Sequence, residues 1–307
     1  MGRVAELGWR ATGRLVSIPP ADDIPDGELL DLPGRGQTYV IDTGPVETAC
    51  GNSVQPPPLF LLHALACTGL LTWYPALREL RQHYRVVLFD QRWHGQGIHS
   101  PRFTLEDCAD DAAAVADALG IDRFVAVGYS MGSLVAQLTW RRHPRRLAGA
   151  VLCASTTRFP GSRNDPAALR VVSAGLAAAA KRRAAVVRAV RAQPPHCDRW
   201  DHNRWAFAQF RSTPGSGVAG AAAAISRFDS SAWIGGMDVP AAVVVTGRDR
   251  LISPARQHAL ARQIPHAAVY EIDAGHASCV LRAERFTPAV RSACASVAAR
   301  AAAHEPR

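Results

Sequence analysis

The sequence has no C-x-x-C motif, and its seven cysteines are odd in number and irregularly spaced. Zinc sites built on paired cysteines and disulfide frameworks both depend on regular cysteine spacing, so we expect neither. Most of these cysteines are predicted to be small apolar fillers in a reducing compartment.

Long apolar runs are also missing. The N-terminus lacks the continuous apolar region of a secretory signal peptide, and no later stretch is long and uncharged enough to span a membrane. We therefore expect a cytoplasmic protein. The hydrophobic fraction of 48% and the charged fraction of 20% are typical of globular proteins. The length of 307 residues suits one large domain, or a core domain with an insertion.

Lysine is nearly absent, so the net charge of +9 comes from arginine. A basic chain can bind nucleic acid, but most of these arginines are spread along the chain, and we expect no nucleic-acid partner. One helical cluster is basic: Lys181, Arg182, Arg183, Arg188 and Arg191. We favour a solvated helix face for this cluster over a surface that contacts an anionic membrane or an acidic acyl carrier.

Short apolar runs recur along the chain, each bounded by turn or polar residues. They are Leu59–Leu62, Val86–Phe89, Phe124–Val127, Ala150–Cys153, Ala242–Val245 and Ala268–Ile272. Apolar character on both faces is typical of strands buried in a parallel sheet. One more short strand is expected around Thr38–Ile41, within an otherwise irregular lead-in that is rich in Pro, Gly and Asp.

Helical patterns lie between these strands. One begins at Thr104 with a capping box to Asp107 and ends at Gly120. Strands that alternate with helices predict an α/β fold with a mostly parallel central sheet flanked by helices. The other helices are expected over residues 130–142 and 255–263, and from residue 288 onward.

The segment 157–236 breaks this alternation because it is too long for one crossover connection. Its middle, residues 167–190, is rich in alanine and valine, which favours helix. We therefore predict a core made of residues 1–156 and 237–307, with 157–236 inserted as a helical cap. The cap aromatics either line an apolar acyl pocket or pack the cap on the core: Trp200, Trp205, Phe207 and Phe210.

The strongest functional pattern is Gly128-Tyr129-Ser130-Met131-Gly132, which follows an apolar strand and precedes a helical pattern. In that context G-x-S-x-G predicts a nucleophile elbow, a tight turn that exposes the serine hydroxyl above the sheet. A Cβ at either glycine is expected to collide with neighbouring backbone. The alternative is a glycine-rich turn with a capping serine, and the partners of the serine decide between the two.

A serine nucleophile needs a base, and the base needs an acid that orients it. His276 follows the last predicted strand and Asp249 follows the strand before it, so Ser130, Asp249 and His276 all lie beyond carboxyl ends of strands, where ligands bind in open α/β sheets. Their chain order is also that of such a triad. We favour Asp249 over two rival acids: Asp273 is only three residues from the histidine, and Asp238 precedes its strand.

An oxyanion hole needs two N–H donors, and we expect the backbone N–H groups of Leu65 and Met131 to supply them. Leu65 lies in the loop after an early strand, and Met131 follows the nucleophile. For His63 we expect a structural role that binds loop backbone, because the base role is already taken.

These motifs resemble the α/β-hydrolase superfamily, in particular esterase-like and lactonase-like serine hydrolases of actinobacteria. The resemblance runs from about residue 32 to the C-terminus and rests on L-L-H-A-L-A, F-D-Q-R-W-H-G-Q-G, G-Y-S-M-G, G-R-D and G-H. Residues 90–95 look like the family's D-x-R-G-H-G loop, which braces the site, so His94 is not assigned to catalysis. Ala64, Trp93 and Ser133 stand where the family commonly has glycine.

The resemblance and the triad imply acyl transfer from a small-molecule substrate to water, with no cofactor and no metal. A carboxylic ester is expected, with a thioester or a lactone as alternatives. The serine at position 130 counts against the epoxide hydrolases and dehalogenases of this fold, which use an aspartate nucleophile. Carbon–carbon bond hydrolysis, cofactor-free perhydrolase chemistry and a non-catalytic ligand-binding role on the same fold stay open.

Overall fold

The computed structural model describes residues 19–21, 23–46, 55–159 and 198–304. They contain a sheet of eight strands in the order β1-β2-β4-β3-β5-β6-β7-β8. β1 and β2 pair antiparallel, β2 pairs antiparallel with β4, and the remaining neighbours are parallel. The strands are β1 (Glu28–Leu32), β2 (Gly36–Asp42), β3 (Leu59–Leu62), β4 (Val86–Phe89), β5 (Phe124–Tyr129), β6 (Leu147–Cys153), β7 (Ala241–Thr246) and β8 (Ala268–Ile272).

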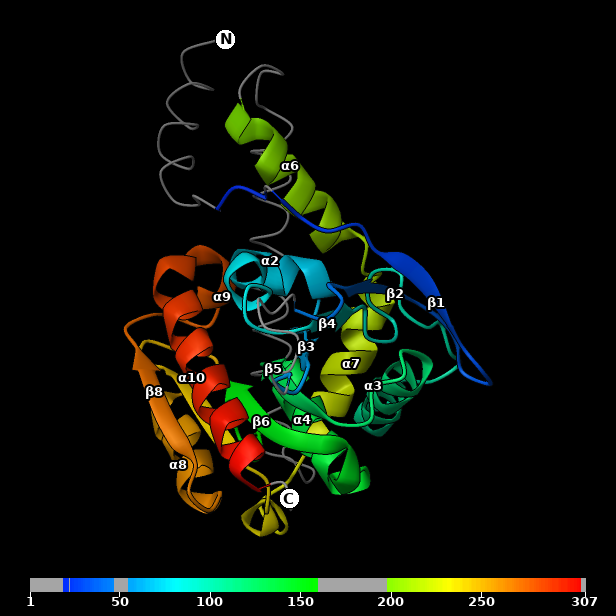
Figure 1. Ribbon diagram of the computed structural model, residues 1–307. Helices are drawn as coiled ribbons and strands as arrows, with labels where there is room; N and C mark the ends of the chain where they lie inside the picture. The colour runs from blue at the N-terminus through cyan, green and yellow to red at the C-terminus, as the bar shows by residue number, and fades with distance from the viewer. Residues whose placement is uncertain (1–18, 22, 47–54, 160–197, 305–307) are drawn as a thin grey trace, which may run out of the picture.

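Helices cover both faces of this sheet (Figure 1). They are α2 (Gly69–Leu80), α3 (Leu105–Ala118), α4 (Met131–Arg142), α6 (Asp198–Arg211), α7 (Gly215–Arg227), α8 (Pro254–Gln263), α9 (Ser278–Leu281) and α10 (Ala283–His304), with 3-10 turns at Pro144–Arg146 and Ile234–Gly236. On β3, Phe60 and Leu62 pack in one core with α3, α4 and α8, while Leu59 and Leu61 pack in a second core with α2 and α10. Side chains alternate between faces along a strand, so two apolar cores give the continuous apolar runs of the sequence. The predicted α/β fold with a mostly parallel, helix-flanked sheet is confirmed.

Three local predictions were wrong. The lead-in carries a second strand, β1, which pairs with β2 as a hairpin. The last helix begins at Ala283, so Pro288 lies inside it and does not start it. β8 is an edge strand, and it is not buried on both faces: Val269 is 45% exposed. An edge strand has only one neighbour, and so its pattern is less uniformly buried than that of central strands.

The predicted cap of the helix that begins after Thr104 and the predicted burial of most cysteines are both found in the described residues. The hydroxyl of Thr104 accepts a hydrogen bond from the Asp107 N–H at 3.0 Å and so caps α3. The five described cysteines are free, and four of them are buried in the two cores: Cys108, Cys153, Cys279 and Cys294.

Between β6 and β7 the structure describes the helices α6 and α7. The two ends of this inserted segment are joined, because Arg158 and Asp229 form an antiparallel bridge and the Ser230 N–H donates to the Thr157 carbonyl at 2.8 Å. The basic cluster at 181–191 lies outside the described residues, so the division into core and cap stays a prediction. None of the helices that the structure describes is long and apolar enough to cross a membrane.

Candidate active site

Ser130 lies in the turn between β5 and α4, with φ 52° and ψ −114°. A residue other than glycine in this region costs about 1–3 kcal/mol, and such strain clusters at functional sites. The two flanking glycines make the turn possible. A Cβ on Gly132 would lie 2.1 Å from the carbonyl oxygen of Leu62, and one on Gly128 would lie 2.3 Å from that of Gly132. Both contacts are with backbone, so the sequence needs glycine at these positions.

The structure brings the three predicted triad residues together. His276 Nε2 lies 2.9 Å from Ser130 Oγ, and His276 Nδ1 lies 2.7 Å from Asp249 Oδ2. The side chain of Asp249 is fully buried, whereas that of His276 is 24% exposed. An ionised carboxylate only accepts hydrogen bonds, so Nδ1 carries the proton and Nε2 is free to accept one from the serine hydroxyl.

Asp249 is held by more donors than the histidine alone. Burial raises the pKa of its carboxyl group, but the hydrogen bonds and the nearby imidazole outweigh burial and hold the pKa below its usual value. Asp249 is therefore a carboxylate at neutral pH. The further donors are Thr246 Oγ1 at 2.8 Å, Leu251 N at 2.8 Å, Ile252 N at 3.0 Å and Gln257 Nε2 at 3.3 Å.

The two rival acids are engaged elsewhere. Asp273 is about half exposed and pairs with Arg248 and Arg285, at 2.7 and 2.8 Å. Asp238 accepts a hydrogen bond from the indole of Trp140 at 2.9 Å, before β7 begins. The geometry therefore agrees with the preference for Asp249.

Tyr129 also contributes to the site, and the sequence pattern did not single it out. Its hydroxyl donates to the backbone carbonyl of His276 at 2.7 Å and lies 3.0 Å from Ser278 Oγ. It thus ties the loop that carries the base to the strand that carries the nucleophile. Its place as the variable residue of G-x-S-x-G was the only available signal, and that position accepts many residue types.

Leu65 lies in the loop after β3 and Met131 directly follows Ser130, and β3 and β5 are neighbours in the sheet. Met131 is the first residue of α4, and its N–H has no acceptor within the helix. The Leu65 N–H donates to no backbone carbonyl of the described residues. Nearby, Ala66 has φ 63° whereas Ala64 is not at positive φ, so the backbone conformation at position 64 does not require glycine.

His63 binds loop backbone, as expected. Its Nε2 accepts from the Gln91 N–H at 2.8 Å, its Nδ1 lies 2.8 Å from the Ala64 carbonyl, and the Gln91 amide donates to the His63 carbonyl at 2.9 Å. Burial, with His94 adding to it, lowers the pKa of His63 well below its usual value, so the ring is neutral and Nδ1 donates.

The 90–97 loop is fixed from two sides. Asp90 accepts from the N–H groups of Gly69 and Gln96 at 2.8 and 2.9 Å, and burial raises its pKa to about 6. Arg92 forms a buried, two-pronged ion pair with Asp111 of α3 at 2.6 and 2.7 Å. The loop is therefore held to α2 and α3, and Gln91 links it to His63 in the loop after β3.

The inserted helices contact this framework. Trp93 has φ 63°, its indole donates to the Ser100 carbonyl at 2.8 Å, and its ring packs on Gly220 of α7. On α6, Gln209 Oε1 accepts from the Thr68 hydroxyl at 2.8 Å.

The cap aromatics are described only in part. Trp205 of α6 packs edge-on against Tyr74 of α2, with ring centroids 5.0 Å apart. It thus fits the core-packing alternative. The side chains of Trp200 and Phe207 lie outside the described part of the chain.

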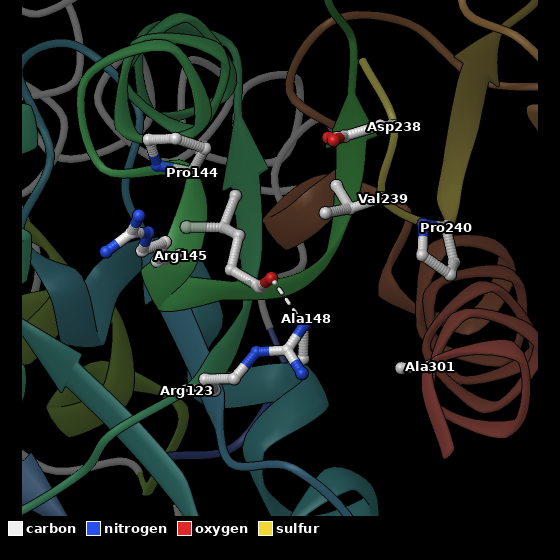
Figure 2. Close-up of a pocket in the computed structure, with 9 residues that line it drawn as sticks. Arg123, Pro144, Arg145, Ala148, Asp238, Val239, Pro240 and Ala301 are labelled. Atoms are coloured by element: carbon white, nitrogen blue, oxygen red, sulfur yellow. Dashed lines mark hydrogen bonds between the residues drawn. The ribbon is translucent and has the colours of Figure 1, made fainter. Parts of the chain in front are cut away.

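One cavity lies away from this site (Figure 2). It opens at the amino ends of β5, β6 and β7, whereas the triad residues follow carboxyl ends of strands, at the opposite edge of the sheet. It is therefore not part of the candidate active site. Its lining residues are Arg123, Pro144, Arg145, Leu147, Ala148, Asp238, Val239, Pro240 and Ala301.

Comparisons with known proteins identify the family of the fold. The sequence model of the family described as alpha/beta hydrolase fold matches residues 57–283. "3-Oxoadipate enol-lactonase 1" of Acinetobacter baylyi is 25% identical over 220 residues, 70% of this chain and 80% of that protein. The solved structure of a thermophilic esterase from Thermogutta terrifontis is 26% identical, with a TM-score of 0.64 over 87% of this chain and 97% of that chain.

A second curated relative matches a shorter part of the chain. "Putative carbamate hydrolase RutD" of Caulobacter vibrioides is 33% identical over 119 residues, which are 38% of this chain. The chain thus spans only 41% of the length of that relative. Both curated relatives come from proteobacteria, so the actinobacterial part of the resemblance stays a prediction.

Proposed function

The chain belongs to the alpha/beta hydrolase fold family, and from that premise we propose that it is a serine hydrolase that cleaves a carboxylic ester through an acyl-enzyme on Ser130. The observation that carries the proposal is the unbroken hydrogen-bonded line from Ser130 Oγ through His276 to Asp249. It pairs a strained, glycine-flanked serine with a base whose tautomer is set by a buried carboxylate.

In this mechanism His276 Nε2 takes the proton of Ser130 Oγ while the oxygen attacks the substrate carbonyl carbon. Asp249 balances the charge of the imidazolium, and the N–H groups of Leu65 and Met131 bind the oxyanion. Collapse of the tetrahedral intermediate expels the alcohol, which receives the proton from His276. Water then repeats the sequence on the acyl-enzyme and releases the acid.

An ester is the first choice of substrate, with a thioester or a lactone next. The similarity to the Thermogutta esterase and to the Acinetobacter enol-lactonase supports ester and lactone bonds as substrates. A carbamate is a second candidate because of the name of the Caulobacter relative, and the same acyl-transfer steps apply to it. We propose a small-molecule acyl substrate in a cytoplasmic setting, with no nucleic-acid partner.

The test is a substrate panel measured with wild type and two variants. It contains p-nitrophenyl esters of graded chain length, thioesters, lactones and aryl carbamates, with a diketone and an acetate–peroxide mixture for the rival chemistries. We expect ester turnover that disappears in Ser130→Ala and survives in Asp273→Asn, which removes the rival acid. Turnover that persists in Ser130→Ala, or turnover of the diketone alone, contradicts the proposal. Tight ligand binding without any product supports the non-catalytic alternative.

A further inference from the structure

The backbone carbonyl of Ser130 accepts two hydrogen bonds from one residue, Ser133. The Ser133 N–H lies 2.9 Å from the carbonyl oxygen, and the Ser133 hydroxyl lies 2.5 Å from it. This carbonyl belongs to the same peptide unit as the N–H of Met131, the proposed oxyanion donor. The unit is planar and conjugated, so a group bound to its carbonyl acts directly on its N–H.

Ser133 is the end of a buried chain of polar side chains. Its Oγ lies 2.7 Å from Ser155 Oγ, which lies 3.1 Å from Gln137 Nε2. The other end of that amide, Gln137 Oε1, accepts from the Ser230 hydroxyl at 2.6 Å. All four side chains are fully buried. Buried polar groups normally have hydrogen-bond partners, and each of these four side chains has at least one.

The direction of donation follows from the number of protons. A carbonyl only accepts, so the Ser133 hydroxyl gives its single proton to Ser130. Ser155 must then donate to Ser133, and Ser155 in turn accepts from the amide of Gln137. The orientation of that amide is set because its oxygen accepts from Ser230. Every bond of the chain therefore points toward the Ser130 carbonyl.

We propose that Ser133 is a positioning residue that holds and polarises the Ser130–Met131 peptide for binding of the oxyanion. Hydrogen bonds in a chain strengthen one another by roughly 10–30% each, so donation to the carbonyl makes the Met131 N–H a better donor. The same bond resists rotation of the peptide away from the ψ of −114° at Ser130. The inference rests on the proposed function, because only an acyl-transfer site needs this donor.

The experiment measures the rate at which a fluorophosphonate labels Ser130, which needs no knowledge of the natural substrate. In that reaction the phosphoryl oxygen occupies the oxyanion site while Ser130 Oγ gives its proton to His276 and attacks phosphorus; the P–F bond breaks and fluoride leaves. In Ser133→Ala we expect the limiting labelling rate to fall roughly 3- to 30-fold, less than the 10²–10³ that follows loss of a whole oxyanion donor. The half-saturating probe concentration and the pH profile should not change, because the probe pocket and His276 are intact.

Ser155→Ala is the second variant, and it keeps the Ser133–Ser130 bond while it removes the residue that donates to Ser133. We expect a fall of roughly two- to fivefold, since only the cooperative part is lost. Thr139→Val is the matched control. Thr139 is also a buried hydroxyl on α4, and it donates to the Val135 carbonyl at 2.8 Å. This control should lower thermal stability about as much as Ser133→Ala while it labels at the wild-type rate.

The outcomes separate the inference from the proposed function. Labelling of wild type at Ser130 with an equal rate in Ser133→Ala overturns the inference and leaves the proposed function standing. Equal slowing in Thr139→Val overturns it too, because general loosening of α4 then explains the effect. If Ser133→Ala does not fold, an unchanged rate in Ser155→Ala overturns it. Absence of labelling in wild type overturns the proposed function, and the inference falls with it.

Discussion

Replacement of Asp249 with asparagine separates the charge of the triad acid from its shape. Oδ1 accepts the N–H groups of Leu251 and Ile252, so the side-chain oxygen of an asparagine must face that pair and its NH₂ group must face His276. Nδ1 of the imidazole then meets a donor and has to become an acceptor. The proton moves to Nε2, which points at Ser130 and no longer accepts its proton.

The expected loss follows from these contacts. With the base in the wrong tautomer, turnover should fall about 10⁴-fold, as for the equivalent change in a serine protease triad. The new NH₂ group also faces the amide of Gln257, a donor that already lies 3.3 Å from Oδ2. A buried donor left without an acceptor costs about 1–3 kcal/mol, so the free energy of unfolding should fall by about 2 kcal/mol.

The pH dependence of stability gives a second readout. The folded-state pKa of Asp249 lies below the ordinary value, so its contribution is present above pH 4 and is lost as the pH falls through the folded pKa. An asparagine does not titrate. The difference in unfolding free energy between wild type and Asp249→Asn should therefore narrow in acid.

The assay combines steady-state ester turnover with urea unfolding at several pH values. Asp273→Asn is the control, because this exposed carboxylate pairs only with surface arginines. It should keep turnover within about twofold, since exposed ion pairs contribute little. A misoriented base should leave far less than about a tenth of wild-type turnover. If Asp249→Asn keeps more turnover than that, or if Asp273→Asn loses more turnover than Asp249→Asn, Asp249 is not the triad acid.

Three further predictions concern the scaffold. Gly132→Ala should lower the free energy of unfolding by about 3 kcal/mol or more, because its Cβ meets backbone at 2.1 Å; urea unfolding measures this, and a folded, active variant would contradict it. Asp111→Ala should cost about 3 kcal/mol, since it leaves the buried guanidinium of Arg92 with only the Asp107 carboxylate at 3.8 Å and the Ser100 hydroxyl at 3.2 Å, whereas exposed Glu284→Ala should cost under about 0.5 kcal/mol; similar losses in both variants would contradict this expectation. Burial lowers the pKa of His94 to about 4 from 6.5, so the unfolded chain binds the proton first, and stability should rise with pH from 4 to 6.5. His94→Phe should flatten that rise by up to about 3 kcal/mol, and an unchanged slope in chemical unfolding would speak against it.

The sequence predicted the elements whose pattern is local. The bounds of β3 and β4 were predicted to the residue because both strands are buried on both faces and end at turn residues. β1 was not predicted because its sequence, E-L-L-D-L, mixes charged with apolar residues and lies on an exposed edge of the sheet. α2 was not predicted because it begins at Gly69 and contains Pro75, and glycine and proline usually mark loops.

Within the candidate site, too, some residues were predictable from the sequence and others were not. The nucleophile, base and acid each follow the carboxyl end of a predicted parallel strand, so their convergence was predictable from the strand pattern, and their chain order supported it. The side chains that hydrogen-bond to the acid or lie behind the elbow were not predictable. Thr246 and Gln257, which bind the acid, and Ser155 and Ser230, which stand behind the elbow, are ordinary polar residues in sequence. The packing of α8 against the sheet brings Gln257 to the acid, and the packing of α4 links Ser155 and Ser230 to the elbow through Ser133 and Gln137.

The most direct test of the central claim is to locate the covalent adduct. The protein is treated with a fluorophosphonate or quenched in acid during ester turnover, digested, and mapped by mass spectrometry. The account predicts one adduct, on the peptide that carries Ser130, which is absent in Ser130→Ala. Ester turnover without an adduct, or an adduct on a different residue, would contradict it.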